Sequence, residues 1–213
     1  MRFAPWLATA ASVLVLACNS QPDMTDPSGT SSAPLRPKLT NIIGSTTQPA
    51  QARVLLPQAE VAPILSVGDI LPGSGEPWAP TPDGLGAYAD GSDLVLFANH
   101  ELNKSGVTSS NGGPAFTYSR VSRLRLDPTT LAVKSGDYVE TGSSALERLC
   151  SATWVTAAEG FADGYFFTGE EQSGTANDAV QVAISSAGVL TKLPRLGRFS
   201  HENYISVPGL RSR

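Results

Sequence analysis

The stretch Leu94-Val95-Leu96-Phe97, followed closely by Asn99-His100-Glu101-Leu102, predicts a buried β-strand that ends in polar groups. A short apolar run bounded by turn residues is typical of a strand, and Asp90-Gly91 supplies the turn signal before it. A similar pattern returns near the end of the chain, where Leu196-Gly197-Arg198-Phe199 precedes Ser200-His201-Glu202-Asn203. Both histidines of the chain are therefore followed by a glutamate at the end of an apolar run. One interpretation is that such ends are simply solvated; the other, which the repetition favours, is a metal-binding or acid–base site.

The chain beyond residue 60 repeats this pattern of short apolar or alternating runs between turn signals. No segment keeps the apolar period of about 3.6 residues for three turns, and the nearest approach, Ser143–Leu149, predicts one helical turn. The predicted strands are Ile64–Val67, Leu94–Phe97, Tyr118–Leu126, Leu131–Val139, Ala152–Thr156, Tyr165–Thr168, Val180–Ile184 and Tyr204–Val207. The predicted turns are Asp83-Gly84, Asp90-Gly91, Asn111-Gly112-Gly113-Pro114, Asp163-Gly164 and Ala187-Gly188. We therefore expect an all-β fold, and the spacing suits a sandwich, a barrel or a propeller.

Residues 1–17 predict a lipoprotein signal peptide. Arg2 provides the positive charge, an apolar stretch follows, and Val15-Leu16-Ala17-Cys18 resembles the bacterial lipobox, in which the cysteine is lipidated. An ordinary cleaved signal peptide is the alternative. Residues 18–59 are rich in Ser, Thr, Pro and Gln and predict a disordered tether, so that residues 60–213 form the folded body. We expect an exported protein of the bacterial cell envelope, held at the outer membrane or cell surface through lipid on Cys18.

The charge of the chain argues against nucleic acid as a partner. The net charge is −4 and the isoelectric point about 5.1, and the basic residues are scattered apart from Arg120, Arg123 and Arg125 on one predicted strand. We interpret these three as a solvated face rather than a phosphate clamp. The sequence also lacks a Gly-x-Ser-x-Gly elbow, a Walker-type phosphate loop and a dinucleotide fingerprint after a strand, which argues against α/β-hydrolase and nucleotide-binding folds.

A cysteine and two adjacent glutamates form a further candidate site. If Cys18 carries lipid, Cys150 has no disulfide partner in an oxidising compartment, and it is then either buried and inert or held by a metal. Glu170 and Glu171 follow the aromatic strand Tyr165-Phe166-Phe167. Neighbouring residues on a strand face opposite ways, so one carboxylate is expected to point inward, where it needs a cation or several hydrogen-bond donors. A thiolate with carboxylates suits a transition metal, and carboxylates with backbone oxygens suit calcium.

Longer strings, spread in order from about Val67 to Gly209, connect the chain to a known family. They are Ile70-Leu71-Pro72, Pro82-Asp83-Gly84-Leu85-Gly86-Ala87-Tyr88, Phe97-Ala98-Asn99-His100-Glu101-Leu102, Thr117-Tyr118-Ser119-Arg120, Leu149-Cys150-Ser151-Ala152, Gly169-Glu170-Glu171 and Leu193-Pro194-Arg195-Leu196-Gly197-Arg198-Phe199-Ser200-His201-Glu202-Asn203. Together they resemble the PhoX-type bacterial alkaline phosphatase and phytase-like β-propeller superfamily, above all its less characterised cell-surface members. The segment around Cys150 departs from the proven phosphatases, because it lacks their glycine-rich and second-cysteine features.

The resemblance implies a secreted β-propeller whose channel holds calcium and iron, which bind phosphate and activate an oxygen nucleophile. It implies that Cys150 ligates iron and that Glu171 can substitute for Glu170. The metal ligands implied by motif are Glu101, Cys150, Glu170, Glu171 and Glu202, and the supporting residues are His100 and His201.

The activity implied by the resemblance is that of a metal-dependent phosphoric-ester hydrolase acting on a small phosphorylated substrate. A propeller blade takes about 40 residues, so residues 60–213 are expected to supply three to four blades of a partial propeller. We therefore expect a C-terminally truncated domain, with a C-terminal half encoded separately. Two alternatives stay open: a non-catalytic, calcium-stabilised cell-surface lipoprotein, and an inactive gene fragment.

Overall fold

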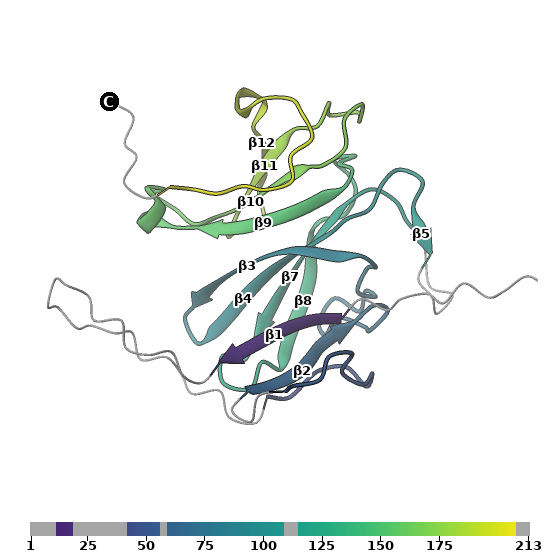
Figure 1. Cartoon of the computed structure of the whole chain (residues 1–213), viewed down its shortest axis with the longest axis vertical. Helices are drawn as coiled ribbons and strands as arrows, with labels where there is room; N and C mark the ends of the chain where they lie inside the picture. Colours follow the sequence, from purple (N-terminus) through teal and green to yellow (C-terminus); the bar gives the residue numbers. More distant parts are fainter. Residues whose placement is uncertain (1–11, 19–41, 56–58, 109–114, 208–213) are drawn as a thin grey trace, which may run out of the picture.

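The computed structural model describes residues 12–18, 42–55, 59–108 and 115–207. Figure 1 shows the two four-stranded sheets lying one above the other, and two further pairs of strands, β1–β2 and β5–β6, complete the fold. All pairings between the named strands are antiparallel. The prediction of an all-β fold is confirmed. In the described part of the chain no helix is both long and apolar enough to cross a membrane.

The first sheet contains the stretch that begins with Leu94. Its strands are β3 (Pro82–Asp90), β4 (Asp93–His100), β7 (Arg120–Leu126) and β8 (Val133–Glu140), in the order β3-β4-β7-β8. A small hairpin of β5 (Val107–Thr108) and β6 (Ala115–Phe116) is inserted between β4 and β7. The register pairs His100 with Arg120, so the end of β4 lies beside the start of β7.

The second sheet is built in the same way from the next part of the chain. Its strands are β9 (Leu149–Val155), β10 (Tyr165–Glu170), β11 (Gln181–Ser185) and β12 (Leu190–Lys192), in the order β12-β11-β10-β9. Of two short 3-10 helices, η1 (Ala157–Glu159) lies between β9 and β10, and η2 (Pro194–Leu196) follows β12. Within the described residues both sheets are open meanders, in which consecutive strands of each sheet pair and only the β5–β6 hairpin interrupts the sequence order, between β4 and β7.

The N-terminal part of the chain contributes one strand pair. Strand β1 (Ser12–Cys18), inside the predicted signal and lipobox region, pairs with β2 (Ala59–Ser66). Residues 42–55, inside the predicted tether, form no helix or strand, but the backbone N–H of Ile43 donates to the carbonyl of Thr130 at 2.8 Å and that of Ser45 to Ile64 at 2.9 Å. The packed body therefore includes residues upstream of residue 60. Residues 1–11 of the predicted signal and 19–41 and 56–58 of the predicted tether lie outside the described residues.

The core is divided by β4, which is buried on both faces. Val95 and Phe97 face the second sheet and pack in a cluster with Phe166 and Ile184, whereas Leu96 packs on the opposite side of the first sheet. Burial of one such large apolar side chain stabilises the fold by about 2 kcal/mol. The continuous apolar run in β4 is thus explained by a strand that lies between two layers of side chains.

The two sheets approach most closely where β3 crosses β9. A Cβ atom added at Gly84 would lie 2.3 Å from the carbonyl oxygen of Cys150, and one at Gly86 would lie 2.8 Å from the ring of Phe166. Any larger residue at these positions would force the strands apart. The two glycines therefore permit backbone contact between the sheets, and Gly84 places its neighbour Asp83 beside Cys150.

Several local predictions differ from the structure. Asp83-Gly84 lies inside β3 and not at a turn, because the β3–β4 register shifts between Pro82 and Leu85 and absorbs the two residues as an irregularity of the strand. Tyr204–Val207 forms no strand, since no other described segment pairs with it, and Ser143–Leu149 contains no helical turn. The turns at Asp90-Gly91 and Ala187-Gly188 are confirmed as the β3–β4 and β11–β12 connections. The predicted turn at residues 111–114 lies outside the described residues.

Candidate metal centre

Two carboxylates and a thiol meet at one end of the two sheets. Asp83, Glu101 and Cys150 each offer one ligand atom, and these atoms all lie within 4.8 Å of one another. Asp83 belongs to β3, Glu101 follows the last residue of β4, and Cys150 belongs to β9. The thiol of Cys150 donates to Oδ2 of Asp83 across 3.4 Å. The donors come from three separate segments, so the tertiary fold and not a local motif assembles them.

Hydrogen bonds from nearby backbone and side-chain groups hold the segments that carry the donors in place. The N–H of Glu101 donates to the carbonyl of Thr81 at 2.9 Å, which fastens the residue after β4 to the residue before β3. Asn99 fastens β4 to β9, because its side-chain amide donates to the carbonyl of Cys150 at 2.6 Å and to the hydroxyl of Thr168 at 2.7 Å. Asn99 is fully buried, so these bonds are shielded from water. The polar end of β4 is thus a structural clamp between the sheets.

Arg148 bridges two carboxylates beside this cluster. Its Nε donates to Oε1 of Glu101 at 2.8 Å and its guanidinium NH2 donates to Oε2 of Glu171 at 2.9 Å. Arg148 has a left-handed backbone with φ of 53°, which is uncommon for a residue with a branched or long side chain. Its backbone is held from both sides, since its N–H donates to Leu102 at 2.7 Å and its carbonyl accepts from Glu171 at 2.9 Å. The strained residue is therefore fixed by the same segments that carry the site.

The electrostatics of the cluster oppose negative charge on the sulfur. Burial, reinforced by the carboxylates of Asp83, Glu101 and Glu171, raises the pKa of the Cys150 thiol to about 12. Burial also raises the pKa of Glu101, and this effect outweighs the opposing hydrogen bond and charge of Arg148. Ligand thiols are deprotonated when they bind a metal, so a divalent cation here would have to reverse the local preference for a neutral thiol.

Glu170, which was predicted as a metal ligand, points away from this cluster. Its carboxyl group is fully buried, and Oε1 accepts from the N–H of Glu147 at 2.8 Å. Its Oε2 accepts from the N–H of Val180 at 3.0 Å and from the hydroxyl of Thr175 at 3.1 Å. The expectation that one of two adjacent glutamates points inward and finds several donors matches Glu170. Its neighbour Glu171 faces Arg148.

His100 is a core residue with its own hydrogen bonds. Its Nδ1 lies 3.2 Å from the carbonyl of Pro80 and its Nε2 lies 3.1 Å from the hydroxyl of Ser122. A carbonyl only accepts, so Nδ1 carries the proton and Nε2 accepts from Ser122. The rings of His100 and Trp78 lie nearly perpendicular to each other, with their centroids 5.4 Å apart. Burial lowers the pKa of His100 to about 4, so the ring is neutral at pH 7.

The second histidine–glutamate pair does not join the cluster. His201 is buried against Phe199, and its backbone N–H donates to the carbonyl of Glu170 at 2.8 Å. Glu202 is exposed, and it does not belong to the group of donors identified among the described residues. Of the five predicted ligands, the structure brings together Glu101 and Cys150 and places Glu171 beside them through Arg148. It does not bring Glu170 or Glu202 into the same group.

Sequence reasoning missed two residues of this site. Asp83 was interpreted as part of a turn, although it belongs to the Pro82–Tyr88 string, and its place beside Cys150 depends on the contact between β3 and β9. Arg148 stands two positions before Cys150, and this proximity in the sequence was the one signal that could have identified it as a counter-ion of the carboxylates.

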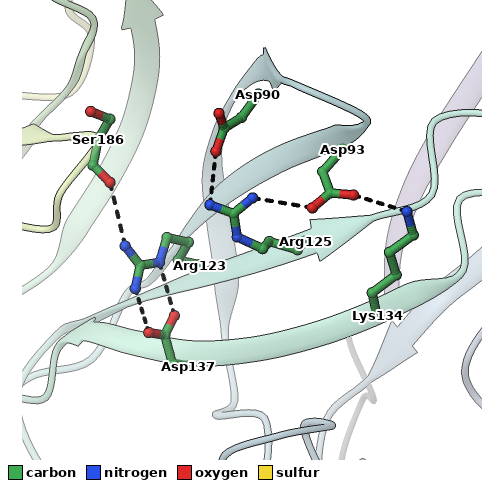
Figure 2. Close-up of polar contacts among 7 residues, drawn as sticks. All are labelled: Asp90, Asp93, Arg123, Arg125, Lys134, Asp137 and Ser186. Carbon is green, nitrogen blue, oxygen red and sulfur yellow. Dashed lines mark hydrogen bonds and ion pairs between the residues drawn. The ribbon is translucent and has the colours of Figure 1, made fainter.

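Two of the three arginines of β7, Arg123 and Arg125, are paired with carboxylates outside this cluster, as Figure 2 shows. Arg123 pairs with Asp137 at 2.5 Å, and Arg125 pairs with Asp90 at 2.8 Å and with Asp93 at 3.1 Å. These pairs are partly exposed and balance positive with negative charge. Arg123 and Arg125 match the interpretation of a solvated face, and an anion would have to displace a carboxylate to bind there. For Arg120 the interpretation is wrong, because its guanidinium lies over the rings of Phe116 and Tyr138 and its Nε is buried.

Comparisons with protein-family models, with curated proteins and with solved structures find no match to this chain. The similarity to the PhoX-type phosphatases therefore stays a prediction from the sequence strings. The functional interpretation depends on the donor set and its surroundings.

The donor set fits a divalent cation. Two carboxylates supply hard oxygen ligands, which calcium and iron both accept, and one sulfur adds a ligand that favours a transition metal. The closeness of the donor atoms is compatible with one shared ion. The net charge of the surroundings points the same way, because Arg148 is the one cation that contacts Glu101 and Glu171 among the described residues.

Proposed function

We propose that this chain is a metal-dependent phosphoric-ester hydrolase of the PhoX type, or the N-terminal part of one, and that Asp83, Glu101 and Cys150 hold a divalent cation. The observation that carries the proposal is the meeting of these two carboxylates and one thiol from three separate segments within 4.8 Å. Carboxylates crowded together repel one another, and a bound cation removes that repulsion. Their arrangement around a sulfur resembles a ligand set more than a hydrogen-bonded core.

The residues would divide the work as follows. Asp83 and Glu101 would bind calcium or iron through oxygen, and Cys150 would bind iron through sulfur. The bound cation would polarise a phosphoryl oxygen and neutralise charge on the transferring group. The side chain of Arg148 is 43% exposed and that of Glu101 is 16% exposed, so a small phosphorylated substrate would approach from the side of Arg148.

The propeller belongs to the same proposal. Each sheet is a four-stranded up-and-down meander, which is the form of a propeller blade, and the two sheets share the cluster of Val95, Phe97 and Phe166. The first strands of the two sheets, β3 and β9, lie together near the proposed ligands. Such a position is expected where the first strands of successive blades line a central channel.

The location of the protein is also proposed from the sequence. Lipid on Cys18 would anchor the chain in the bacterial cell envelope, at the outer membrane or cell surface, after export. The same lipid on Cys18 would leave Cys150 without a disulfide partner in an oxidising compartment, and a bound metal would protect its sulfur.

Hydrolysis of a generic phosphomonoester, p-nitrophenyl phosphate, tests the activity. We expect turnover by the purified chain with added calcium and iron, loss of turnover with a chelator, and loss of at least tenfold in Glu101→Gln. The matched control is Glu76→Gln, which removes the same charge from an exposed position. If the parent hydrolyses nothing but still contains bound metal, the hydrolase proposal is wrong and the metal site stands.

A second candidate function is supported by the Arg148 contacts. Arg148 already joins Glu101 to Glu171, and such pairing can hold loops together without any reaction. This reading makes the chain a non-catalytic, calcium-stabilised cell-surface lipoprotein. It predicts a melting temperature that rises with calcium in a chain that contains no iron and hydrolyses no phosphomonoester.

A further inference from the structure

Arg148 occupies the place where the proposed metal site would need its ligands free. Its guanidinium contacts Glu101 through Nε at 2.8 Å and Glu171 through the terminal nitrogen at 2.9 Å. Glu101 is also a member of the donor group with Asp83 and Cys150. One carboxylate therefore has two competing partners, a resident guanidinium and an incoming cation.

The exposure of the pair shows which partner can leave. The Arg148 side chain is 43% exposed, whereas Glu101 is 16% exposed and its backbone N–H is bonded to Thr81. The guanidinium can turn outward into solvent without unfolding the backbone, since the Arg148 N–H and carbonyl are held by Leu102 and Glu171. Glu101 has no comparable freedom.

A guanidinium released beside a bound metal ion can bind an anion. Arginine presents several N–H donors in a planar fork that matches the oxygens of phosphate. Arg123 and Arg125, by contrast, are paired with aspartates elsewhere in the first sheet. Arg148 is thus the cation best placed to meet an oxyanion at the metal.

We propose that Arg148 is the resident counter-cation of this site, which a divalent cation displaces from Glu101 and which then binds a phosphate oxyanion. The inference rests on the proposed metal site and goes beyond it in two ways. Metal and Arg148 compete for Glu101, so removal of Arg148 strengthens metal binding. Metal binding also frees the guanidinium, so phosphate binds well only after the metal and only when Arg148 is present.

Calcium titration of the full chain by isothermal calorimetry tests the competition. A partly exposed ion pair is worth up to about 1 kcal/mol, so we expect Arg148→Gln to bind calcium about three- to fivefold more tightly than the parent. The matched control, Arg195→Gln, removes the same charge from an exposed residue of η2 and should leave the affinity unchanged. An equal or weaker calcium affinity in Arg148→Gln overturns the inference, because it would mean that Arg148 holds the ligands in place.

Equilibrium dialysis with labelled inorganic phosphate tests the second half. We expect the calcium-loaded parent to bind phosphate at least tenfold more tightly than either the metal-free parent or calcium-loaded Arg148→Gln. Arg148→Lys keeps the charge but loses the fork, and should show intermediate phosphate binding. Equal phosphate binding by parent and Arg148→Gln, both loaded with calcium, overturns the anion role. If the parent binds no divalent cation, the proposed function itself fails, and the inference fails with it.

Discussion

Replacement of Glu170 by Gln separates a structural carboxylate from a metal ligand. The side chain is fully buried, and its two oxygens accept three hydrogen bonds, from the N–H groups of Glu147 and Val180 and from the hydroxyl of Thr175. An amide has the same shape but only one acceptor oxygen. Whichever way the amide turns, its NH2 group faces a backbone N–H that has lost its acceptor.

The cost follows from these contacts. Leaving one buried donor unsatisfied costs about 1–3 kcal/mol, and the remaining bonds weaken because the acceptor is no longer charged. We therefore expect Glu170→Gln to lower the free energy of unfolding by about 3 kcal/mol. Glu171→Gln is the matched control at the next position, where loss of a partly exposed ion pair with Arg148 should cost at most about 1 kcal/mol.

Urea unfolding followed by tryptophan fluorescence, in chelator, measures both variants. The midpoint should fall clearly in Glu170→Gln with an unchanged slope, and the folded variant should keep the calcium affinity of the parent. A Glu170→Gln variant as stable as the parent, or one that is stable but has lost its metal, would refute the assignment of Glu170 to the fold. Such a result would restore Glu170 as a ligand.

Three further predictions follow from other parts of the structure. Gly84→Ala should lower the free energy of unfolding by about 3 kcal/mol and weaken metal binding, because the new Cβ meets backbone atoms of β9. The control Gly91→Ala has open space around it and should lose about 1 kcal/mol, because its backbone is left-handed. Equal losses of the two variants in urea unfolding would contradict this prediction. The pKa of His100 is about 4 in the folded chain and near 6.5 in the unfolded chain, so the unfolded chain takes up a proton first as the pH falls. The free energy of unfolding should therefore fall by about 3 kcal/mol between pH 6.5 and 4. His100→Asn should flatten this pH dependence, and an unchanged slope would show that other groups cause it. Expression in a bacterium should give a mature chain that starts at lipidated Cys18, so that only one residue of β1 remains. Intact mass and detergent partition measure this. A mature chain that keeps Ser12 would contradict the prediction and would retain β1 as part of the fold.

The class of the fold could be predicted from the sequence because strand signals are local. The apolar run in β4 and the turns at Asp90-Gly91 and Ala187-Gly188 depend on neighbours along the chain, and the structure confirms them. Tyr204–Val207 has the same composition as a strand but forms none, because pairing requires a partner that no local signal supplies. The turn predicted at Asp83-Gly84 is wrong for the opposite reason. Tertiary contact with β9 holds this turn-like dipeptide inside β3, where it forms an irregularity of the strand.

The candidate site was only partly predictable for the same reason. Residue type and position made Glu101 and Cys150 candidate site residues, the family resemblance implied that both are ligands, and the structure places them together. Glu170 and Glu171 could be recognised as an inward and an outward pair, but the sequence does not say which carboxylate points inward. The periodicity of a strand fixes alternation, whereas the sheet that covers a given face is fixed by contacts far along the chain.

The central claim is that the sulfur of Cys150 and the carboxylates of Asp83 and Glu101 hold one divalent cation. Titration of the reduced full chain with cobalt(II), followed by absorption spectroscopy, tests it most directly, because a cobalt–thiolate bond produces a charge-transfer band in the near ultraviolet. We predict that band in the parent at one equivalent of cobalt, its absence in Cys150→Ser, and a weaker affinity without loss of the band in Asp83→Asn. A parent that binds cobalt without the band, or a band that survives Cys150→Ser, would contradict the account.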